Sequence, residues 1–584
     1  MKSKILLLPV MALLLSGCLK EKNESYTTLD NYFQTAAQIE TGLNGCYNSL
    51  RTIYQHRGYW QMTEIAADLM YMSSSTQYDA NCDVSPARPG AASTVWQYGY
   101  IGVKNTNEMT YAISKAVENG YITEEAAAPL YAEAAVLRAM YYYILTSTFG
   151  DVPFYAEPVT EENRQKIATL PRMDANQTRD YCIEELYDLI VVQKALPMIR
   201  TYEGTGYRAG AAVGLMVAAK MCLWNERWED AIMFIDELEN IYGHYADPAK
   251  VKDFGVDYPL TDVPFSQKYV KESIFEMANV VEAYGLQTSS MIAACCMPSR
   301  VSEAAIESAR NAKAAKDTED AGNNAGNEED GESTEDTSGS DCYAGIFIPE
   351  LGGSARTSTA ARPTTYLYSR LLPYYSKDLR SAEYTSDKDT TRRGGSGTLA
   401  WIWEGYDAVN DPNRENQQIM FFYSDTSLKS QLSFTKRPWM GNKFWAYGMS
   451  DTKDPNNYKI FRFADALLMK AEAYLNMGDY ANASAYLNIT RTRAGLTDLT
   501  YEGAGSESDS FMEEIRKERA RELVGEFQRK YDLVRWGIWY ERTLEHNENS
   551  YIKGFIRPCH RYWPIPADQV AYSGYALDNN EYLE

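Results

Sequence analysis

Histidine is scarce in this chain, and cysteine does not occur at metal-binding spacing. Only four of the 584 residues are His, and no two of the nine Cys residues form a C-x-x-C pair. Zinc sites are built mainly from Cys and His side chains at short, regular spacings. The sequence therefore favours neither a metal centre nor another cofactor, and we expect none. Most of the cysteines are expected to be buried as small apolar residues.

Positive charge is also in short supply. Lys and Arg number 57 against 80 Asp and Glu, which gives a formal net charge of −23. A chain with this balance is repelled by a phosphate backbone, since nucleic-acid binding depends on cations that displace counterions. We therefore exclude nucleic acid as a partner.

Long apolar runs are missing after the N-terminus, where no segment offers the ~20 consecutive apolar residues of a membrane-spanning helix. The apolar run Ile5–Leu15 follows a positively charged start and ends in LSGC at Cys18, as in a secretory signal. The bulky-small-small-Cys ending resembles a bacterial lipobox. We expect residues 1–17 to be the signal peptide and residues 18–30 to be lipidated Cys18 and a polar tether. An ordinary signal with a chance Cys is the alternative.

Periodic apolar residues predict several paired helices. Apolar residues keep helical spacing from Leu130 to Ile144, and the pattern stops at Gly150. Two further segments read as helix–turn–helix units, with turns at 225–227 and 477–479. Such a unit of ~34 residues resembles a tetratricopeptide repeat, and these units usually stack into a curved scaffold. The sequence predicts a mostly α fold, a tetratricopeptide-like helix-pair scaffold with long irregular loops and a few short strands.

The longest irregular segment covers residues 256–445. Its strand candidates are SIFEMANVV (273–281) and QIMFFYS (418–424). Residues 317–341 are rich in acids, Gly and Ser and contain no Lys or Arg, a composition that cannot bury a core. We therefore predict an acidic disordered insertion at about 301–341. Calcium binding is the alternative, although the acids lack the ordered spacing of a calcium loop.

The stretch IRKERARELVGEFQRKYDLVRWG, Ile515–Gly537, combines an apolar stripe with many charges. On one helix, the stripe consists of Leu523, Phe527, Tyr531 and Val534. Opposite charges three residues apart would pair along it as Glu518–Arg521, Arg519–Glu522, Glu526–Arg529 and Asp532–Arg535. Only Arg516, Lys517 and Lys530 are left over. This pattern predicts a self-paired structural helix and not a nucleic-acid-binding one.

Several motifs together resemble a known family. FRFADALLMKAEAYLNMGD (461–479), the stretch Ile515–Gly537 and YWPIPADQV (562–570) are similar to the C-terminal signature of the SusD/RagB family, surface lipoproteins of glycan-foraging Bacteroidetes. YAEAAVLRAMYYYILTSTFGDVPF (131–154) and RPTTYLYSRLLPYYSKDLR (362–380) extend the resemblance upstream. The chain departs from the family at the acidic insertion and in its C-terminal YALDNNEYLE.

This resemblance implies an N-terminal SusD-like helical region at 31–255 and a C-terminal SusD/RagB region at 256–584. It also implies an outer-membrane, lipid-anchored and surface-exposed protein that performs no chemistry. Such a protein would sit over a SusC-like TonB-dependent transporter, capture an oligosaccharide and pass it on for import.

A glycan site needs exposed aromatic faces for sugar C–H groups and polar side chains for the hydroxyls. Tyrosine is abundant, 46 residues against 17 Phe. Three loops combine both kinds of residue, and their candidates are Asp68, Tyr71, Tyr78, Asn81 and Asp83 in the first, Tyr284 and Gln287 in the second, and Trp401, Trp403 and Tyr406 in the third. For each aromatic, packing in the core is the alternative. Trp96 begins a helical pattern and is left out.

The loop ELGGSARTST before the RPTT element has no aromatic residue, where starch-binding relatives tend to carry one. This argues against starch and not against other glycans. Two other functions stay open. Part of the family serves peptide uptake, so the captured nutrient could be a peptide. An enzyme that degrades surface glycans is the third reading, but no nucleophile or metal motif supports it.

Overall fold

The computed structural model describes residues 32–72, 74–204, 206–243, 260–279, 292–296, 360–373, 376–384, 397–402, 438–441, 443–446, 455–501 and 507–583. The predicted signal peptide, the tether, the acidic insertion and the strand candidate 418–424 lie outside these residues.

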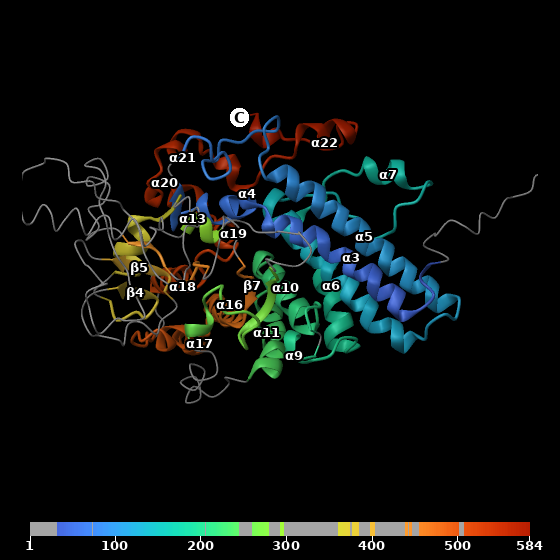
Figure 1. Cartoon of the computed structure of the whole chain (residues 1–584), viewed down its shortest axis with the longest axis horizontal. Helices are drawn as coiled ribbons and strands as arrows, with labels where there is room; N and C mark the ends of the chain where they lie inside the picture. The colour runs from blue at the N-terminus through green and yellow to red at the C-terminus, as the bar shows by residue number, and fades with distance from the viewer. Residues whose placement is uncertain are drawn as a thin grey trace, which may run out of the picture.

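Three long helices pack side by side at one end of the molecule (Figure 1). They are α3 (Ala36–Gln55), α5 (Ala92–Glu118) and α6 (Glu124–Phe149). A Cβ atom on Gly102 of α5 would lie 2.1 Å from the ring of Tyr141 of α6, so glycine allows this close approach. The Tyr141 hydroxyl in turn accepts a hydrogen bond from the backbone N–H of Leu50 in α3 at 3.1 Å. As the sequence predicts, α6 ends at Gly150, whose φ is +70°.

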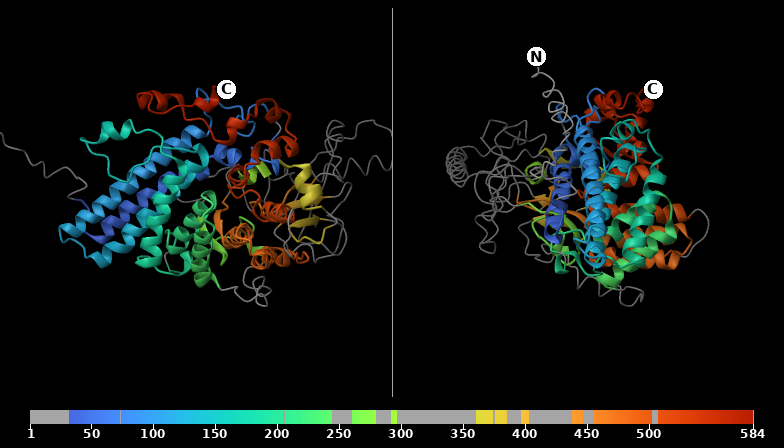
Figure 2. Two further views of the ribbon diagram at one scale, coloured as in Figure 1. Left: turned by 180° about the vertical axis from the view of Figure 1, so that it is seen from behind. Right: turned by 90° about the vertical axis from the view of Figure 1, so that its right-hand side faces the viewer.

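Two helix pairs continue the fold behind this layer (Figure 2). The first pair is α10 (Ala211–Trp224) with α11 (Trp228–Tyr242), and the second is α16 (Phe463–Asn476) with α17 (Tyr480–Arg493). Helix α11 packs against α16, so the pairs stack on each other. The turns fall where the sequence predicts them, and the prediction of a mostly α, tetratricopeptide-like scaffold is confirmed.

The stack of pairs contains a polar link. Lys470 of α16 donates from Nζ to Glu239 of α11 at 2.7 Å and to the Tyr486 hydroxyl of α17 at 2.7 Å. It also forms an ion pair of 2.5 Å with Asp236. Lys470 is buried, and its ammonium group contacts all three of these side chains. It therefore fixes α11, α16 and α17 relative to one another.

Shorter elements connect these layers. The helices are α4 (Arg57–Trp60), η1 (Gln61–Ile65), α7 (Arg164–Ala168), α8 (Ala175–Leu186), η2 (Tyr187–Val192), α9 (Thr201–Gly204), η4 (Leu260–Asp262), α13 (Ile292–Cys296), η6 (Tyr366–Leu371), α20 (Trp539–His546), α21 (Ser550–Phe555), η10 (Pro558–Arg561), α22 (Ala567–Tyr572) and η11 (Asn580–Tyr582).

The strands form small sheets. β1 (Met70–Met72) pairs antiparallel with β3 (Ala361–Pro363), and β2 (Ser273–Met277) pairs antiparallel with β7 (Tyr458–Arg462). β5 (Leu399–Ile402) lies between β4 (Ser381–Tyr384), to which it is parallel, and β6 (Trp439–Met440), to which it is antiparallel. The strand predicted at 273–281 is therefore confirmed for its first five residues.

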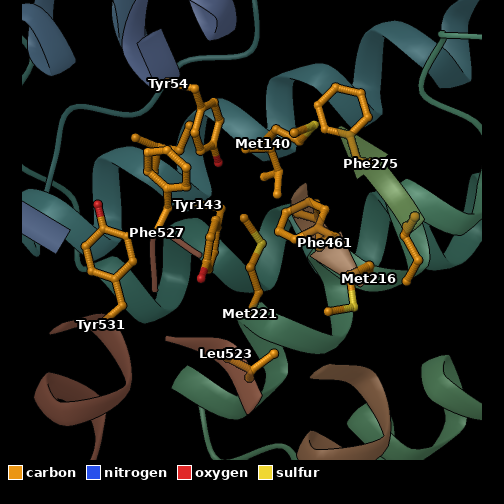
Figure 3. Close-up of a cluster of buried hydrophobic side chains, with 14 of the residues drawn as sticks. Tyr54, Met140, Tyr143, Met216, Met221, Phe275, Phe461, Leu523, Phe527 and Tyr531 are labelled. Carbon is orange, nitrogen blue, oxygen red and sulfur yellow. The ribbon is translucent and has the colours of Figure 1, made fainter. Parts of the chain in front are cut away.

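The stretch Ile515–Gly537 is not one helix, so that prediction was wrong. It forms α18 (Glu507–Leu523) and α19 (Arg529–Arg535), separated by a turn in which Gly525 has φ +85° and Phe527 has φ +63°. The apolar residues still meet in the core, because the turn brings the Phe527 ring to 5.3 Å from that of Tyr54 (Figure 3). The Tyr59 ring lies 5.9 Å from Phe527. Leu523, Phe527 and Tyr531 are buried, and Val534 is half-buried.

The charge pairing along this stretch was only half correct. Glu518–Arg521 and Asp532–Arg535 are confirmed at 3.2 and 2.9 Å. The other four charges instead bind partners distant in sequence, through Arg519–Asp465 (2.8 Å), Glu522–Arg462 (2.9 Å), Glu526–Lys443 (2.7 Å) and Arg529–Asp68 (2.7 Å). These side chains are covered by neighbouring elements, so each must find its counter-charge inside the protein.

The three cations expected to be left over also have partners. Arg516 and Lys517 lie 3.6 and 2.7 Å from Glu513 and Glu514. Lys530 is buried, donates to the carbonyl oxygen of His560 at 2.6 Å, and lies 4.4 Å from the ring centres of both Trp539 and Trp563.

One hydrophobic core continues from Ile39 to Leu577 and so runs through both predicted regions of the chain. Cys46, Cys82, Cys182, Cys222, Cys295 and Cys296 are buried and unbridged, and Cys559 is half-buried. Of the helices that the structure describes, none is both long and apolar enough to cross a membrane.

Candidate functional site

The first candidate loop, residues 67–83, follows η1, which is anchored by Glu64. This carboxylate is fully buried and accepts hydrogen bonds from the backbone N–H groups of Gly525, Gln528 and Arg529 at 2.8, 2.7 and 3.1 Å. Burial raises the pKa of Glu64 to about 7, although these three bonds act in the opposite direction. The loop is thus attached to the turn between α18 and α19.

Two predicted site residues lie beneath the surface and hold the loop in place. Asp68 is fully buried and accepts two hydrogen bonds from Arg529, at 2.8 and 2.7 Å. Burial would raise the pKa of Asp68, but Arg529 overcomes this and the pKa lies below its ordinary value. Asn81 is also fully buried, donates to the carbonyl of Ser74 at 2.8 Å and accepts from Asn549 at 2.7 Å. Both side chains are hydrogen-bonded to other parts of the protein, so their role in this structure is to hold the loop.

Two other predicted residues, Tyr78 and Asp83, both contact Arg88. The Tyr78 side chain is 43% exposed, and the guanidinium carbon of Arg88 lies 4.9 Å from the centre of its ring. Arg88 also forms an ion pair with Asp83. The group Tyr78, Asp83 and Arg88, named here the Tyr78 cluster, combines a partly exposed tyrosine ring with a guanidinium group over one face of that ring and a carboxylate paired to it. Arg88 was not predicted, although it follows Asp83 by five residues and carries the opposite charge.

Tyr71 belongs to the short β1–β3 sheet. It lies opposite Arg362 in the antiparallel register, so both side chains leave the same face. Both residues are half-buried. Burial lowers the pKa of Arg362 to about 10, which Tyr71 partly opposes, and the guanidinium stays charged at neutral pH. The sequence did not indicate Arg362, which begins the RPTT element.

The structure does not place the remaining candidates beside the Tyr78 cluster. Tyr284, Gln287, Trp403, Tyr406 and the predicted lipidation site Cys18 lie outside the described residues. Trp401 lies in β5, and its backbone is in register with Glu383 of β4.

Trp96 lies on α5, as its helical pattern predicts, and packs against Phe149 with ring centres 5.0 Å apart. It forms one wall of a cleft of about 370 Å³ between α5, the segment after α6 and α22. Tyr100, Tyr155 and Tyr572 also line this cleft. Trp96 itself is only 5% exposed, so its ring packs behind the cleft wall and offers little surface to a ligand.

A separate group of aromatic residues was missed. Tyr202 of α9, Tyr207 just after that helix and Tyr269 before β2 converge, and Tyr207 is 67% exposed. The segment YEGTGY (202–207) places two tyrosines among glycines without helical or strand periodicity. That is the same signal which selected the other loops, and it could have identified this one.

Within the described ranges, no group of His, Cys, Asp and Glu side chains is arranged to hold a metal ion.

Comparison with known proteins gives matches over nearly the whole chain. SusD-like protein P25 of Formosa agariphila is 24% identical over 589 residues, which cover 96% of this chain and 94% of that protein. Surface glycan-binding protein A from Bacteroides uniformis has a similar structure, with a TM-score of 0.62, 21% identity and coverage of 94% of this chain and 100% of the other.

Surface glycan-binding protein A from Bacteroides thetaiotaomicron, solved in complex with laminarihexaose, has a TM-score of 0.61 at 19% identity, with coverage of 94% and 100%. These structures share the fold of the chain described here.

Family profiles match both halves of the chain. A family described as "Starch-binding associating with outer membrane" matches residues 19–192. The SusD family matches residues 272–582, which is more than half of the chain and includes the two helices of the signature stretch. The chain therefore belongs to the SusD family.

Proposed function

We propose that this SusD-family protein is a non-catalytic glycan-binding lipoprotein of the cell surface. The observation that carries the proposal is the Tyr78 cluster, a tyrosine ring that stays 43% exposed although Arg88 stacks over one of its faces, on the loop where the sequence predicts a binding surface. A sugar ring places its C–H face on an aromatic ring and its hydroxyls against donors and acceptors at the rim. Structural relatives named as glycan-binding proteins support the choice of ligand.

Delivery to a membrane partner is the second part of the proposal. The protein passes its oligosaccharide to a SusC-like TonB-dependent transporter, over which it sits as a lid. Membership in the SusD family and the match to a family associated with the outer membrane support this. Lipid on Cys18 attaches the chain to the outer membrane, as the LSGC ending of the signal segment suggests.

The way in which three carboxylates of this region are bound supports binding without hydrolysis. Glycoside hydrolysis requires two carboxyl groups placed on either side of the scissile bond. Here Asp68 is bound by Arg529 and Asp83 by Arg88, while Glu64 is buried against backbone N–H groups. Each of these groups already has a structural partner.

The proposal is tested by calorimetry of the mature chain with oligosaccharides that differ in linkage, and with tryptic peptides as the competing ligand class. Tyr78→Ala should weaken saccharide binding by about tenfold. Tyr121→Ala, a change at a tyrosine with a similar exposed fraction of 45% beyond the end of α5, serves as the control. Binding of peptides and of no saccharide would overturn the substrate class.

The partner claim has its own test. The lipidated chain should co-purify with an outer-membrane barrel from detergent-solubilised membranes, and Cys18→Ala should release the chain from the membrane fraction. A chain that stays in the membrane fraction after this substitution would contradict the lipid anchor.

A further inference from the structure

Tyr202, Tyr207 and Tyr269, here called the tyrosine platform, form one aromatic group at the surface. Tyr202 lies in α9, Tyr207 follows that helix, and Tyr269 precedes β2. The ring centres of Tyr202 and Tyr207 both lie 4.9 Å from that of Tyr269, and they lie 6.4 Å from each other. The planes are inclined by 61°, 56° and 53°, as edge-to-face and tilted contacts require.

The three rings differ in exposure, which gives the group an inner and an outer side. Tyr202 is the inner ring, and its hydroxyl accepts a hydrogen bond from the backbone N–H of Glu276 at 2.5 Å. Burial raises the pKa of Tyr202 well above its ordinary value. Tyr207 is the outer ring, with 67% of its surface exposed, whereas core tyrosines such as Tyr141 are fully buried. Most of the Tyr207 side chain therefore faces solvent.

The backbone at Tyr269 is held in a conformation that large side chains avoid. Its φ is +53°, in the left-handed region that glycine adopts more readily. The backbone N–H of Tyr269 donates to both carboxylate oxygens of Glu276 at 3.0 Å, and Asn457 donates to the same carboxylate at 2.9 Å. Strain of this kind clusters at functional sites, where the position of a side chain matters. Here it directs the Tyr269 ring against Tyr207.

Hydrogen-bonding and charged groups adjoin the platform on the Tyr269 side. Asn457 hydrogen-bonds Tyr269, and Arg51 of α3 is near enough for its charge to act on the Tyr269 pKa, which burial raises. Lys268, the neighbour of Tyr269, donates to the carbonyl of Asn279 at 3.0 Å. Gln55 at the end of α3 donates to the side chain of Asn279 at 2.9 Å. Asn457, Arg51 and Lys268 thus lie on the Tyr269 side of the platform.

We propose that the tyrosine platform is a saccharide-binding subsite, at which the exposed ring of Tyr207 stacks on the C–H face of one sugar residue of an oligosaccharide. The inference rests on the proposed glycan-binding function and adds a second contact area, on α9 and the segment before β2. An open surface on which one tyrosine ring is mostly exposed suits a sugar ring, whose hydroxyls must stay hydrated at the rim. An enclosed apolar pocket would suit an aromatic ligand better.

The test uses the mature chain with three probes, laminarihexaose, cellohexaose and maltohexaose, followed by calorimetry and by saturation-transfer NMR on the sugar protons. For a probe that the unmodified chain binds, Tyr207→Ala should raise Kd about 5- to 20-fold. Tyr207→Phe should stay within about twofold, since stacking needs the ring and not the hydroxyl.

A matched control and a second variant separate binding from folding. Tyr575, on the C-terminal segment after α22, is 78% exposed and also has a left-handed φ of +64°, and Tyr575→Ala should leave Kd unchanged. Helices α9 and α22 lie at opposite edges of the molecule (Figure 1). Tyr269→Gly relieves the left-handed backbone, so it should keep the urea midpoint and still weaken binding.

The outcomes distinguish this inference from the proposed function. If Tyr207→Ala and Tyr269→Gly bind every probe as the unmodified chain does while Tyr78→Ala loses affinity, the platform is no subsite and the proposed function stands. If the unmodified chain binds none of the probes, both the subsite and the proposed function are overturned. Loss of affinity in Tyr575→Ala equal to that in Tyr207→Ala would also overturn the platform.

Discussion

The Asp68 carboxylate and the Arg529 guanidinium, 461 positions apart in sequence, form two hydrogen bonds of 2.8 and 2.7 Å in the protein interior. Asp68 belongs to the first candidate loop and Arg529 begins α19, so the pair joins the binding loop to the family signature. Glu64 makes a second connection of the same kind, to the turn between α18 and α19. The signature stretch therefore fixes the base of the loop that carries the Tyr78 cluster.

Removing Arg529 should destabilise the fold strongly. Arg529→Met leaves the Asp68 carboxylate buried without a counter-charge, which typically costs about 3–5 kcal/mol. Urea unfolding followed by circular dichroism measures the loss. Lys517→Met is the control, because Lys517 and its partner Glu514 are both about a third exposed and such pairs contribute less than about 1 kcal/mol. Adding Asp68→Asn to Arg529→Met should recover part of the loss, and no recovery would contradict the pairing.

Glu522 should be the most sensitive carboxylate of the signature stretch. It is buried and accepts hydrogen bonds from Arg462, Arg380 and Arg493 at 2.9, 3.1 and 2.5 Å. Burial opposes its ionisation, but the three arginines, with Arg493 the strongest, hold its pKa well below the ordinary value. Glu522→Gln should lower the free energy of unfolding by about 3 kcal/mol or more, since three buried cations lose one shared anion. A loss below about 1 kcal/mol by urea titration would show that the arginines do not depend on it.

Glu64 should give a measurable pH dependence. The folded chain keeps the Glu64 proton up to a pKa of about 7, because burial raises it, whereas the unfolded chain releases that proton near the ordinary value of 4.5. Between these values the folded state binds more protons, so the contribution of Glu64 to stability is present below pH 4.5 and is lost as pH rises toward 7. The stability difference between the unmodified chain and Glu64→Gln should fall by about 3 kcal/mol over this window. A difference that stays constant from pH 4.5 to 7 would contradict the raised pKa.

Two glycines in the long helices should respond to alanine in opposite directions. Gly45 of α3 has open space around the position of a Cβ atom, so Gly45→Ala should stabilise the fold by about 0.5–1 kcal/mol. At Gly102 of α5 the same atom would lie 2.1 Å from the Tyr141 ring, and Gly102→Ala should destabilise by about 1–3 kcal/mol. Thermal unfolding of the two variants in parallel checks the sign. Equal effects would show that α5 and α6 are less closely packed than the structure indicates.

The helix pairs could be predicted because their signals are local. The apolar periodicity that predicts α6 lies within that helix and ends at Gly150. The turn that contains Gly478 follows α16 directly and precedes α17. The break between α18 and α19 could not be predicted in this way, since charges and apolar residues continue across it. It depends on Gly525 and Phe527 adopting positive φ while Glu64, far away in sequence, binds the freed N–H groups.

The candidate site was harder to predict than the fold. Asp68 and Asn81 have the residue types that bind sugars, and their burial depends on Arg529 and Asn549, which come from the other end of the chain. Tyr78 is partly exposed and Asp83 is half-buried beside it, and Arg88, which was not predicted, completes the cluster. Exposure is the property that separates a binding tyrosine from a core tyrosine, and it is set by the whole fold.

Calorimetry of the mature chain against β-1,3-, β-1,4- and α-1,4-linked hexasaccharides, with a parallel assay for released reducing ends, tests the central claim most directly. The account predicts reversible binding of at least one hexasaccharide, a weaker affinity in Tyr78→Ala and no cleavage. Binding of peptides with no saccharide bound, or the release of reducing ends from a bound sugar, would contradict it.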